Sequence, residues 1–257
     1  MFTLSGRTAV ITGATGYQGL GMVRALLDGG MNVVMMTHMP DRIAGIIASL
    51  PEEQRARCVA MMDSGKGDAE TFRQVKEKFG SVDVVIPYHG PGPRPEGIDA
   101  FDREEMEKRL GMNVCKTLEM IRDALPYLKE SKAGRIILMS SAGARTGVLE
   151  EGLMDNIVKG AVVSMTYALA RELANDGITV NCVAKSGMVD QHPVGRPERG
   201  KPPVMGEPED DVLKDKLPVG FCGTPENLGA AVAWLASEEA GFVTGEVVNL
   251  NGGYYMG

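Results

Sequence analysis

The chain has 257 residues, of which 44% are hydrophobic, so it can bury the core of one large α/β domain or two small ones. Its net charge of −7 gives no electrostatic reason to bind DNA or RNA. No run reaches the roughly 18 apolar residues of a membrane span, and the N-terminus carries no export signal. We therefore expect a cytoplasmic protein that binds neither nucleic acid nor membrane.

Cysteine and histidine usage argues against disulfides and metals. Cys58, Cys115, Cys182 and Cys222 are scattered and form no CxxC pair, which favours a reduced, intracellular protein. No two of the three histidines stand at a metal-ligand spacing. The sequence therefore predicts no metal site.

Short apolar or β-branched runs alternate with segments of helical periodicity along the whole chain. The runs predict strands at residues 8–11, 32–36, 57–62, 82–86, 135–139, 178–183 and 246–250. Helical spacing predicts helices at 20–27, 41–50, 69–79, 101–128 with a break near Gly111, 154–175 and 228–235. Such alternation predicts parallel strands joined by helical crossovers, so the fold class is α/β with one doubly wound sheet over residues 1–257.

One segment between the last predicted strands has a different composition. Residues 191–209 are rich in proline and charge. They predict a mobile substrate flap around residues 188–215, and a disordered insertion is the alternative.

A glycine-rich turn joins the first predicted strand to the first predicted helix. Its glycines are spaced three apart, which differs from the G-x-G-x-x-G fingerprint. Free amides and the positive end of a helix dipole at such a turn favour a phosphate, and glycine lets the backbone approach it. The alternative is a tight turn without a ligand. The candidate cofactor-binding residues of this turn are Gly13, Thr15, Gly16, Tyr17, Gln18 and Gly19.

Ligands of doubly wound sheets bind beyond the carboxyl ends of the strands. The other predicted strand ends therefore add candidate cofactor-binding residues, namely His38, Asp63, Ser64, His89, Gly90 and Ser186. Two alternatives stay open here. Asp63 is also suited to cap the following helix, and His89 to be a hydrogen-bonded loop histidine.

Several short motifs follow the turn in a fixed order: Asn113, Met139-Ser140-Ser141, Lys159-Gly160-Ala161, Val180-Asn181-Cys182-Val183 and Asn251-Gly252-Gly253. In their order and spacing the chain resembles the short-chain dehydrogenase/reductase family over essentially its whole length. The resemblance implies a seven-stranded Rossmann sheet, a nicotinamide dinucleotide, a small-molecule substrate, and a homotetramer or homodimer.

The chain departs from the family at the catalytic tyrosine. The family has its tyrosine four residues before the lysine, where this chain has Asp155, and the enoyl-reductase branch has it seven before, where this chain has Gly152. Tyr167 falls further along the helix, among core-type residues. The resemblance thus indicates a divergent member and implies four catalytic residues, with Lys159 also holding the cofactor ribose: Asn113, Ser141 (Ser140 in the other register), Asp155 and Lys159.

Two further departures lie at strand ends. Pro87-Tyr88-His89-Gly90 replaces the Asn-Asn-Ala-Gly segment of the family, and Lys185-Ser186 replaces its Pro-Gly.

The chemistry at Asp155 leaves three functions open. Asp155 and Lys159 are four residues apart on a helix, so they can pair, and the ammonium favours the carboxylate. The first function is an oxidoreductase for a carbonyl, alcohol or enone, with the proton handled by Ser141, by Asp155 through water, or by Tyr88 or His89. The second is an isomerase or lyase with Asp155 as base, and the third is dinucleotide binding without turnover. Each residue also has a structural alternative: a strand-end cap for the serines, a dipole-stabilised acid for Asp155, and a solvated lysine for Lys159.

The end of the second predicted strand bears on the cofactor. NAD binding normally requires an acid there for the ribose 2′-hydroxyl, but the sequence reads Thr37-His38-Met39-Pro40. His38 and Arg42 are suited to a 2′-phosphate. The sequence therefore predicts NADP(H), with NAD(H) as the alternative.

Overall fold

The computed structural model describes residues 2–257 except 39, 63–67, 91–95, 149–151 and 189–213. The described chain forms one seven-stranded parallel sheet in the order β3-β2-β1-β4-β5-β6-β7. The strands are β1 (Thr8–Ile11), β2 (Asn32–Thr37), β3 (Cys58–Met62), β4 (Val84–Ile86), β5 (Arg135–Ser141), β6 (Thr179–Lys185) and β7 (Val247–Leu250). The predicted fold class is confirmed. Asp63 and Ser64 lie outside the described residues, and so does most of the flap predicted around 188–215.

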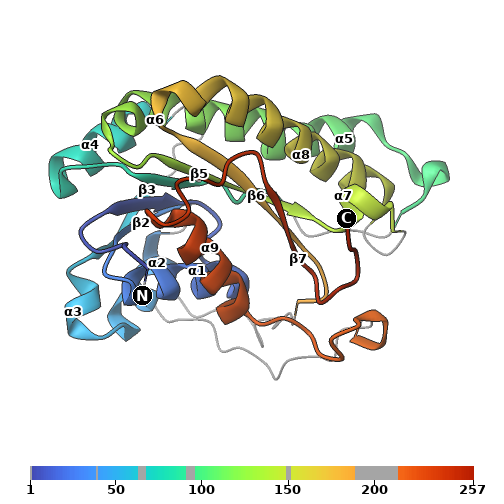
Figure 1. The fold of residues 1–257 in the computed structure, drawn as a ribbon, viewed down its shortest axis with the longest axis horizontal. Coiled ribbons are helices and arrows are strands. Elements are labelled where there is room, and N and C mark those ends of the chain that lie inside the picture. The colour runs from blue at the N-terminus through green and yellow to red at the C-terminus, as the bar shows by residue number, and fades with distance from the viewer. Residues whose placement is uncertain (1, 39, 63–67, 91–95, 149–151, 189–213) are drawn as a thin grey trace.

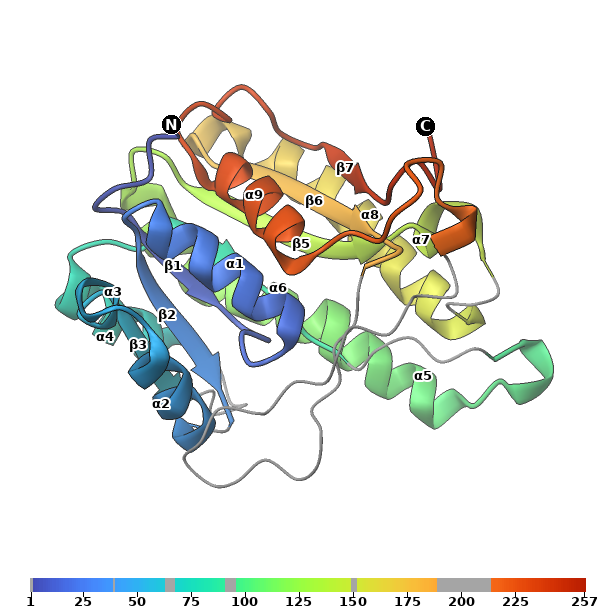
Figure 2. The ribbon, with the colours of Figure 1, turned by 90° about the horizontal axis from the view of Figure 1, so that it is seen from below.

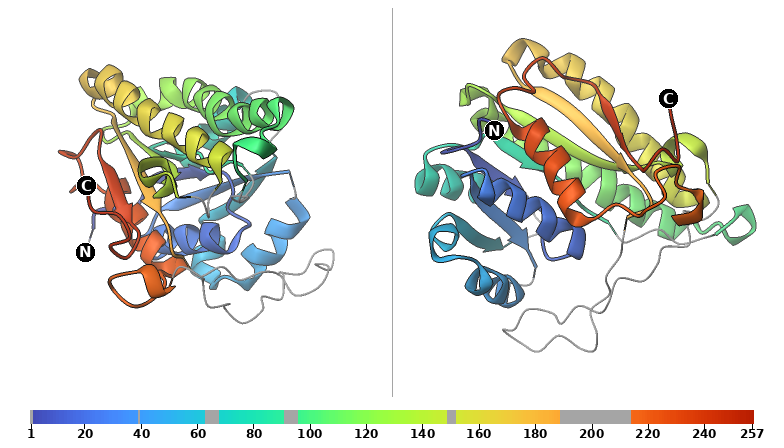
Figure 3. Two further views of the ribbon diagram at one scale, coloured as in Figure 1. Left: turned by 90° about the vertical axis from the view of Figure 1, so that its right-hand side faces the viewer. Right: turned by 60° about the horizontal axis from the view of Figure 1, so that its bottom comes forward.

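Helices cover both faces of the sheet (Figures 1 and 3). On one face lie α1 (Tyr17–Asp28), α2 (Pro40–Ser49) and α9 (Pro225–Ala236), which Figure 2 shows in front of the sheet. On the other lie α4 (Ala69–Phe79), α6 (Lys116–Glu130) and α8 (Leu153–Leu173), with α5 (Arg103–Leu110) leading into α6. Two helices of four residues each, α3 (Glu52–Arg55) and α7 (Gly143–Thr146), are too short to show periodicity and were not predicted.

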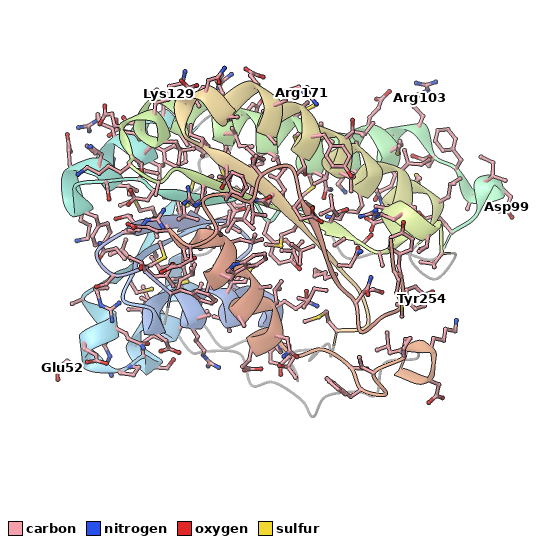
Figure 4. The ribbon with its side chains drawn as sticks, in the orientation of Figure 1. Glu52, Asp99, Arg103, Lys129, Arg171 and Tyr254 are labelled. Carbon is pink, nitrogen blue, oxygen red and sulfur yellow. The ribbon has the colours of Figure 1, made fainter. Side chains whose placement is uncertain are left out.

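Alternating strand residues supply two apolar cores. In β1, Ile11 packs with α1 and α9 while Val10 packs with α4 and α6; in β5, Met139 and Leu138 divide in the same way. Because both faces are covered, the central strands contain continuous apolar runs, such as Ala9–Ile11 in β1 and Ile136–Met139 in β5. On the outer surface of the layer formed by α4, α6 and α8, charged side chains such as Lys129 of α6 project away from the sheet (Figure 4).

The predicted break near Gly111 is a π-helical turn, Gly111–Cys115, between α5 and α6. Asn113, a predicted catalytic residue, lies inside this turn and is buried. Tyr167 was expected among core residues, yet half of its surface is exposed, because the buried face of α8 runs through Thr166 and Ala170.

The described part of the chain contains no helix that is long and apolar enough to cross a membrane. Its four cysteines are free. Burial raises the pKa of Cys58 to about 12, so this thiol stays protonated near neutral pH.

Glycines allow α1 and α9 to touch closely. A Cβ atom built on Gly21 would lie 2.2 Å from the carbonyl oxygen of Pro225, and one on Gly229 would lie 2.5 Å from the oxygen of Gly21. Since α1 begins directly after the glycine-rich turn, this contact helps to fix the position of the turn relative to the sheet.

We predict that Gly21→Ala lowers the free energy of unfolding by about 1–3 kcal/mol, because the methyl group overpacks the contact. Urea denaturation measures the change. The control is Gly160→Ala in α8, where the nearest atom to the new Cβ is 3.9 Å away, so stability should stay equal or rise. Equal stability of Gly21→Ala and the parent would contradict the close contact.

Candidate active site

Most of the predicted site residues meet at one edge of the sheet. The glycine-rich turn follows β1, Tyr88–Gly90 follow β4, and Ser141 and Lys185 end β5 and β6. Parallel strands bring these carboxyl ends together. Ser186 is buried directly after β6, and His38 is exposed after β2, two strands from β4.

Backbone geometry requires glycine at two of the three glycine positions of the turn. Gly13 has φ +65°, and a Cβ there would lie 2.3 Å from the carbonyl oxygen of Tyr88. A Cβ on Gly19 would lie 2.3 Å from the oxygen of Gly13. Gly16 has φ −76° and no atom within 3.7 Å of an added Cβ, so neither packing nor backbone conformation requires glycine there.

The first turn of α1 is open to a ligand. Its N-cap residue, Gly16, offers no side-chain hydrogen bond, and the turn contains no acidic residue that would repel an anion. The amide of Gly16 itself donates to the carbonyl oxygen of Gly13 (3.4 Å), so the amides suited to an anion are those that follow it in the first turn, at the positive end of the helix dipole. These residues fit the phosphates of a dinucleotide.

Tyr88 connects the end of β4 to this turn. Its backbone amide donates to Oγ1 of Thr12 (2.8 Å), and its hydroxyl donates to Oε1 of Gln18 (3.1 Å). Gln18, predicted to bind cofactor, is thus held in place by a residue that the sequence comparison with the family marked as unusual.

Asn113 and Lys159 form the central polar contact of the site. The ammonium Nζ of Lys159 donates to Oδ1 of Asn113 (2.9 Å) and to the carbonyl oxygen of Met139 (3.5 Å). Nδ2 of Asn113 donates to the carbonyl oxygen of Arg109 (3.1 Å). Gly90 packs against the same amide, because a Cβ there would lie 2.5 Å from Nδ2. Two predicted catalytic residues and one predicted cofactor-binding residue are therefore brought together.

The structure distinguishes the two serines at the end of β5. Oγ of Ser140 donates to the carbonyl oxygen of Lys159 (2.9 Å), so Ser140 ties β5 to α8. Successive strand residues point to opposite faces, and Oγ of Ser141 is buried without a hydrogen-bond partner among the described residues. Leaving a buried hydroxyl unpaired costs about 1–3 kcal/mol, which a ligand oxygen would recover. Of the two registers, this favours Ser141 as the ligand-facing residue.

Asp155 lies in the first turn of α8, where the helix dipole favours a carboxylate. Its side chain is 5% exposed, and Oδ1 lies 3.7 Å from Nη1 of Arg109, whose side chain is 2% exposed. Nε of Arg109 also donates to Oε1 of Glu105 (3.0 Å). The pairing of Asp155 with Lys159 stays a prediction. The sequence analysis missed the buried guanidinium of Arg109 beside the Asp155 carboxylate.

His89 lines a water-sized cavity behind Asn113. The other lining residues are Pro87, Thr117, Leu138, Met139 and Val162. A water in this cavity would lie beside the Asn113 side chain.

Neither thiolate nor metal chemistry is indicated at the site. Burial raises the pKa of Cys182, beneath the site in β6, to about 12, although the charges of Lys159 and Arg145 act in the opposite direction. Among the described residues no group of three or more acidic, cysteine or histidine side chains gathers as metal ligands would.

The sequence and fold were compared with known proteins. Residues 13–255 match the family model described as enoyl-(acyl carrier protein) reductase. The chain is 28% identical to the 3-oxoacyl-(acyl-carrier-protein) reductase FabG of Rickettsia conorii over 100% of both chains. It is 30% identical to the 2,3-dihydroxy-2,3-dihydro-p-cumate dehydrogenase of Pseudomonas putida, over 98% of this chain and 96% of the relative. A solved short-chain dehydrogenase/reductase from Brucella melitensis, titled a glucose/ribitol dehydrogenase, superposes with a TM-score of 0.81 at 26% identity, covering 100% of this chain and 99% of that one.

The buried Arg109–Asp155 pair gives a stability prediction. We expect Arg109→Met to lower the free energy of unfolding by about 3–5 kcal/mol, because it removes the buried cation that lies 3.7 Å from the Asp155 carboxylate. Urea denaturation measures this change. The double variant Arg109→Met/Asp155→Leu should recover most of the loss, since no buried charge then remains at either position.

Arg103→Met is the matched control. Arg103 also pairs along α5, with Glu107 at 3.5 Å, but its side chain is 83% exposed, so the change should stay within about 0.5 kcal/mol. An Arg109→Met variant as stable as this control would show that the buried pair is not formed.

Proposed function

Because the chain belongs to the short-chain dehydrogenase/reductase family, we propose that it transfers a hydride between a nicotinamide dinucleotide and a small molecule with a carbonyl, alcohol or enone group. The observation that carries the proposal is the Lys159–Asn113 contact, which lies at the same sheet edge as the open turn at Gly16 and the unpaired hydroxyl of Ser141. Their common position at the carboxyl ends of the strands supports a single site for binding, orientation and proton handling.

When bound, the nicotinamide supplies or accepts the hydride. The amides of the glycine-rich turn hold the diphosphate, and the ammonium of Lys159 is suited to hold the adjacent ribose hydroxyls. The hydroxyl of Ser141 donates a hydrogen bond to the substrate oxygen and so orients the carbonyl. Asn113 fixes Lys159 through its side-chain oxygen.

Proton transfer at this site differs from transfer through a phenol. The cation of Arg109 stabilises the carboxylate of Asp155, and a carboxylate cannot donate a proton. We propose that a proton from solvent reaches the substrate oxygen through water and the hydroxyl of Ser141, with Asp155 accepting a hydrogen bond from that water. General acid–base work contributes about 10²–10⁴-fold, so an altered proton path slows hydride transfer without preventing it.

We also propose NADP(H) as the preferred coenzyme, with NAD(H) as the alternative. In support, no carboxylate occupies the end of β2, where His38 is exposed. A homotetramer or homodimer in the cytoplasm remains part of the proposal. The exposed side chains of Leu118, Ile157 and Tyr167 give α6 and α8 apolar groups on their outer surface, which a second copy is suited to cover.

A coenzyme and turnover assay tests the function. We expect fluorescence titration to give saturable NADPH binding, and a panel of ketones and enones to contain a substrate that oxidises it. Ser141→Ala should lower kcat by about 10²–10³-fold, the cost of one lost hydrogen-bond donor to the reacting oxygen, with coenzyme affinity unchanged. Ser140→Ala is the control. Because it removes the hydrogen bond to Lys159, it should lower the free energy of unfolding, and it should lower kcat less than Ser141→Ala does. Absence of binding by either nicotinamide coenzyme would refute the proposal.

His38→Asp tests coenzyme choice. The new carboxylate repels a 2′-phosphate and can accept bonds from a 2′-hydroxyl, so the ratio of the NADPH and NADH dissociation constants should move toward NADH by about tenfold or more. His38→Gln, which adds no charge, should change this ratio far less. If His38→Asp binds NADPH as tightly as the parent, the predicted preference is wrong.

A further inference from the structure

Lys185 is the last residue of β6, and it reaches across the end of the neighbouring strand. In the β5–β6 register Lys185 lies opposite Ser141, and registered residues of parallel strands point to the same face. Its ammonium Nζ lies 5.8 Å from the centroid of the Tyr88 ring, which follows β4 on the far side of β5. The charge therefore lies over the carboxyl ends of β4 and β5, within the cleft.

This ammonium has no anionic partner in the described part of the chain, although the chain carries a net charge of −7. Its one contact there is the face of the Tyr88 ring, and the residue is half-buried. A ring face stabilises a cation but leaves its hydrogen-bond donors unused. A half-buried lysine in this state is suited to an anion from outside the chain.

Two neighbours of Lys185 indicate where such an anion would lie. On one side, the Tyr88 hydroxyl is hydrogen-bonded to Gln18 in the first turn of α1, at the positive end of the helix dipole. On the other side is Ser141, whose hydroxyl is buried and has no hydrogen-bond partner among the described residues. A ligand oxyanion between them would meet a full positive charge and the positive end of the helix dipole.

We propose that Lys185 binds an oxyanion of a ligand in the cleft, either the diphosphate of the dinucleotide or a carboxylate of the substrate. Both sources offer the same chemistry, an anionic oxygen that accepts a charge-assisted hydrogen bond. Binding of the dinucleotide diphosphate rests on the proposed function. Binding of a ligand carboxylate does not depend on it.

Two binding measurements on Lys185→Met separate the sources. The first is the dissociation constant of NADPH by fluorescence, at low and high salt. The second is calorimetric binding of acetoacetate and of its uncharged methyl ester to the protein saturated with NADP⁺, where no turnover occurs. Loss of one charge-assisted bond should weaken the affected ligand about tenfold and reduce its salt dependence.

Weaker NADPH binding assigns the diphosphate, whereas loss of the preference for acetoacetate over its ester assigns the substrate carboxylate. Lys185→Arg should retain most of the affinity in either case. The matched control is Lys78→Met, because Lys78 also lies over a ring, that of Phe79 at 5.5 Å, but on the exposed surface of α4. It should change neither constant.

The inference is overturned if Lys185→Met and the parent bind both ligands equally, or if the parent binds neither NADPH nor acetoacetate. A parent that binds no coenzyme, yet binds acetoacetate in a manner that depends on Lys185 when tested without NADP⁺, would refute the proposed function and keep this inference. The two failures are thereby distinguishable.

Discussion

The hydrogen bond from the Lys159 ammonium to the Asn113 side chain is the contact on which the arrangement of the site depends. It joins α8 to the π-helical turn between α5 and α6, and the second bond of Lys159, to Met139, adds the end of β5. Asn113 can reach Lys159 while its own amide donates to Arg109, so both ends of its side chain are fixed. The side chain of Lys159 is therefore oriented before a ligand binds, so the entropy cost of ordering it does not reduce the affinity for that ligand.

The sheet and most helices follow from periodicity, which is local. The strands β1 and β5 are continuous apolar runs, and the amphipathic spacing of α4 is plain in Phe72 and Val75. The start of α9 was predicted three residues late, although its signal is also local: Thr224 and Asn227 form a capping box and Pro225 occupies the first turn. The π-helical turn was predicted only as a break, because an extra residue in a helix leaves the apolar spacing disturbed without showing how the backbone adapts.

The site was less predictable wherever its contacts join distant segments. The sequence analysis chose Ser141 but kept Ser140 as the alternative, because only the position of β5 between its neighbours decides which hydroxyl faces α8. Arg109 and Asp155 are 46 positions apart on different helices, and no spacing rule links them. The sole local sign was the spacing of Glu105 and Arg109 along α5, which is also typical of an ordinary surface pair. The roles of all these residues in catalysis remain predictions.

The proposal that Asp155 stands where the family has a phenol requires a partner for a buried carboxylate, and Arg109 lies beside it. A phenol is neutral near pH 7, whereas a carboxylate with a 5% exposed side chain must be paired or else destabilise the fold. Arg109 supplies a positive charge from α5, and Glu105 shares it. Lys159 and Lys185 add two further positive charges near the carboxyl ends of the strands. Under the proposed function, these cations offset the carboxylate of Asp155, so its negative charge alone does not oppose the binding of an anionic dinucleotide.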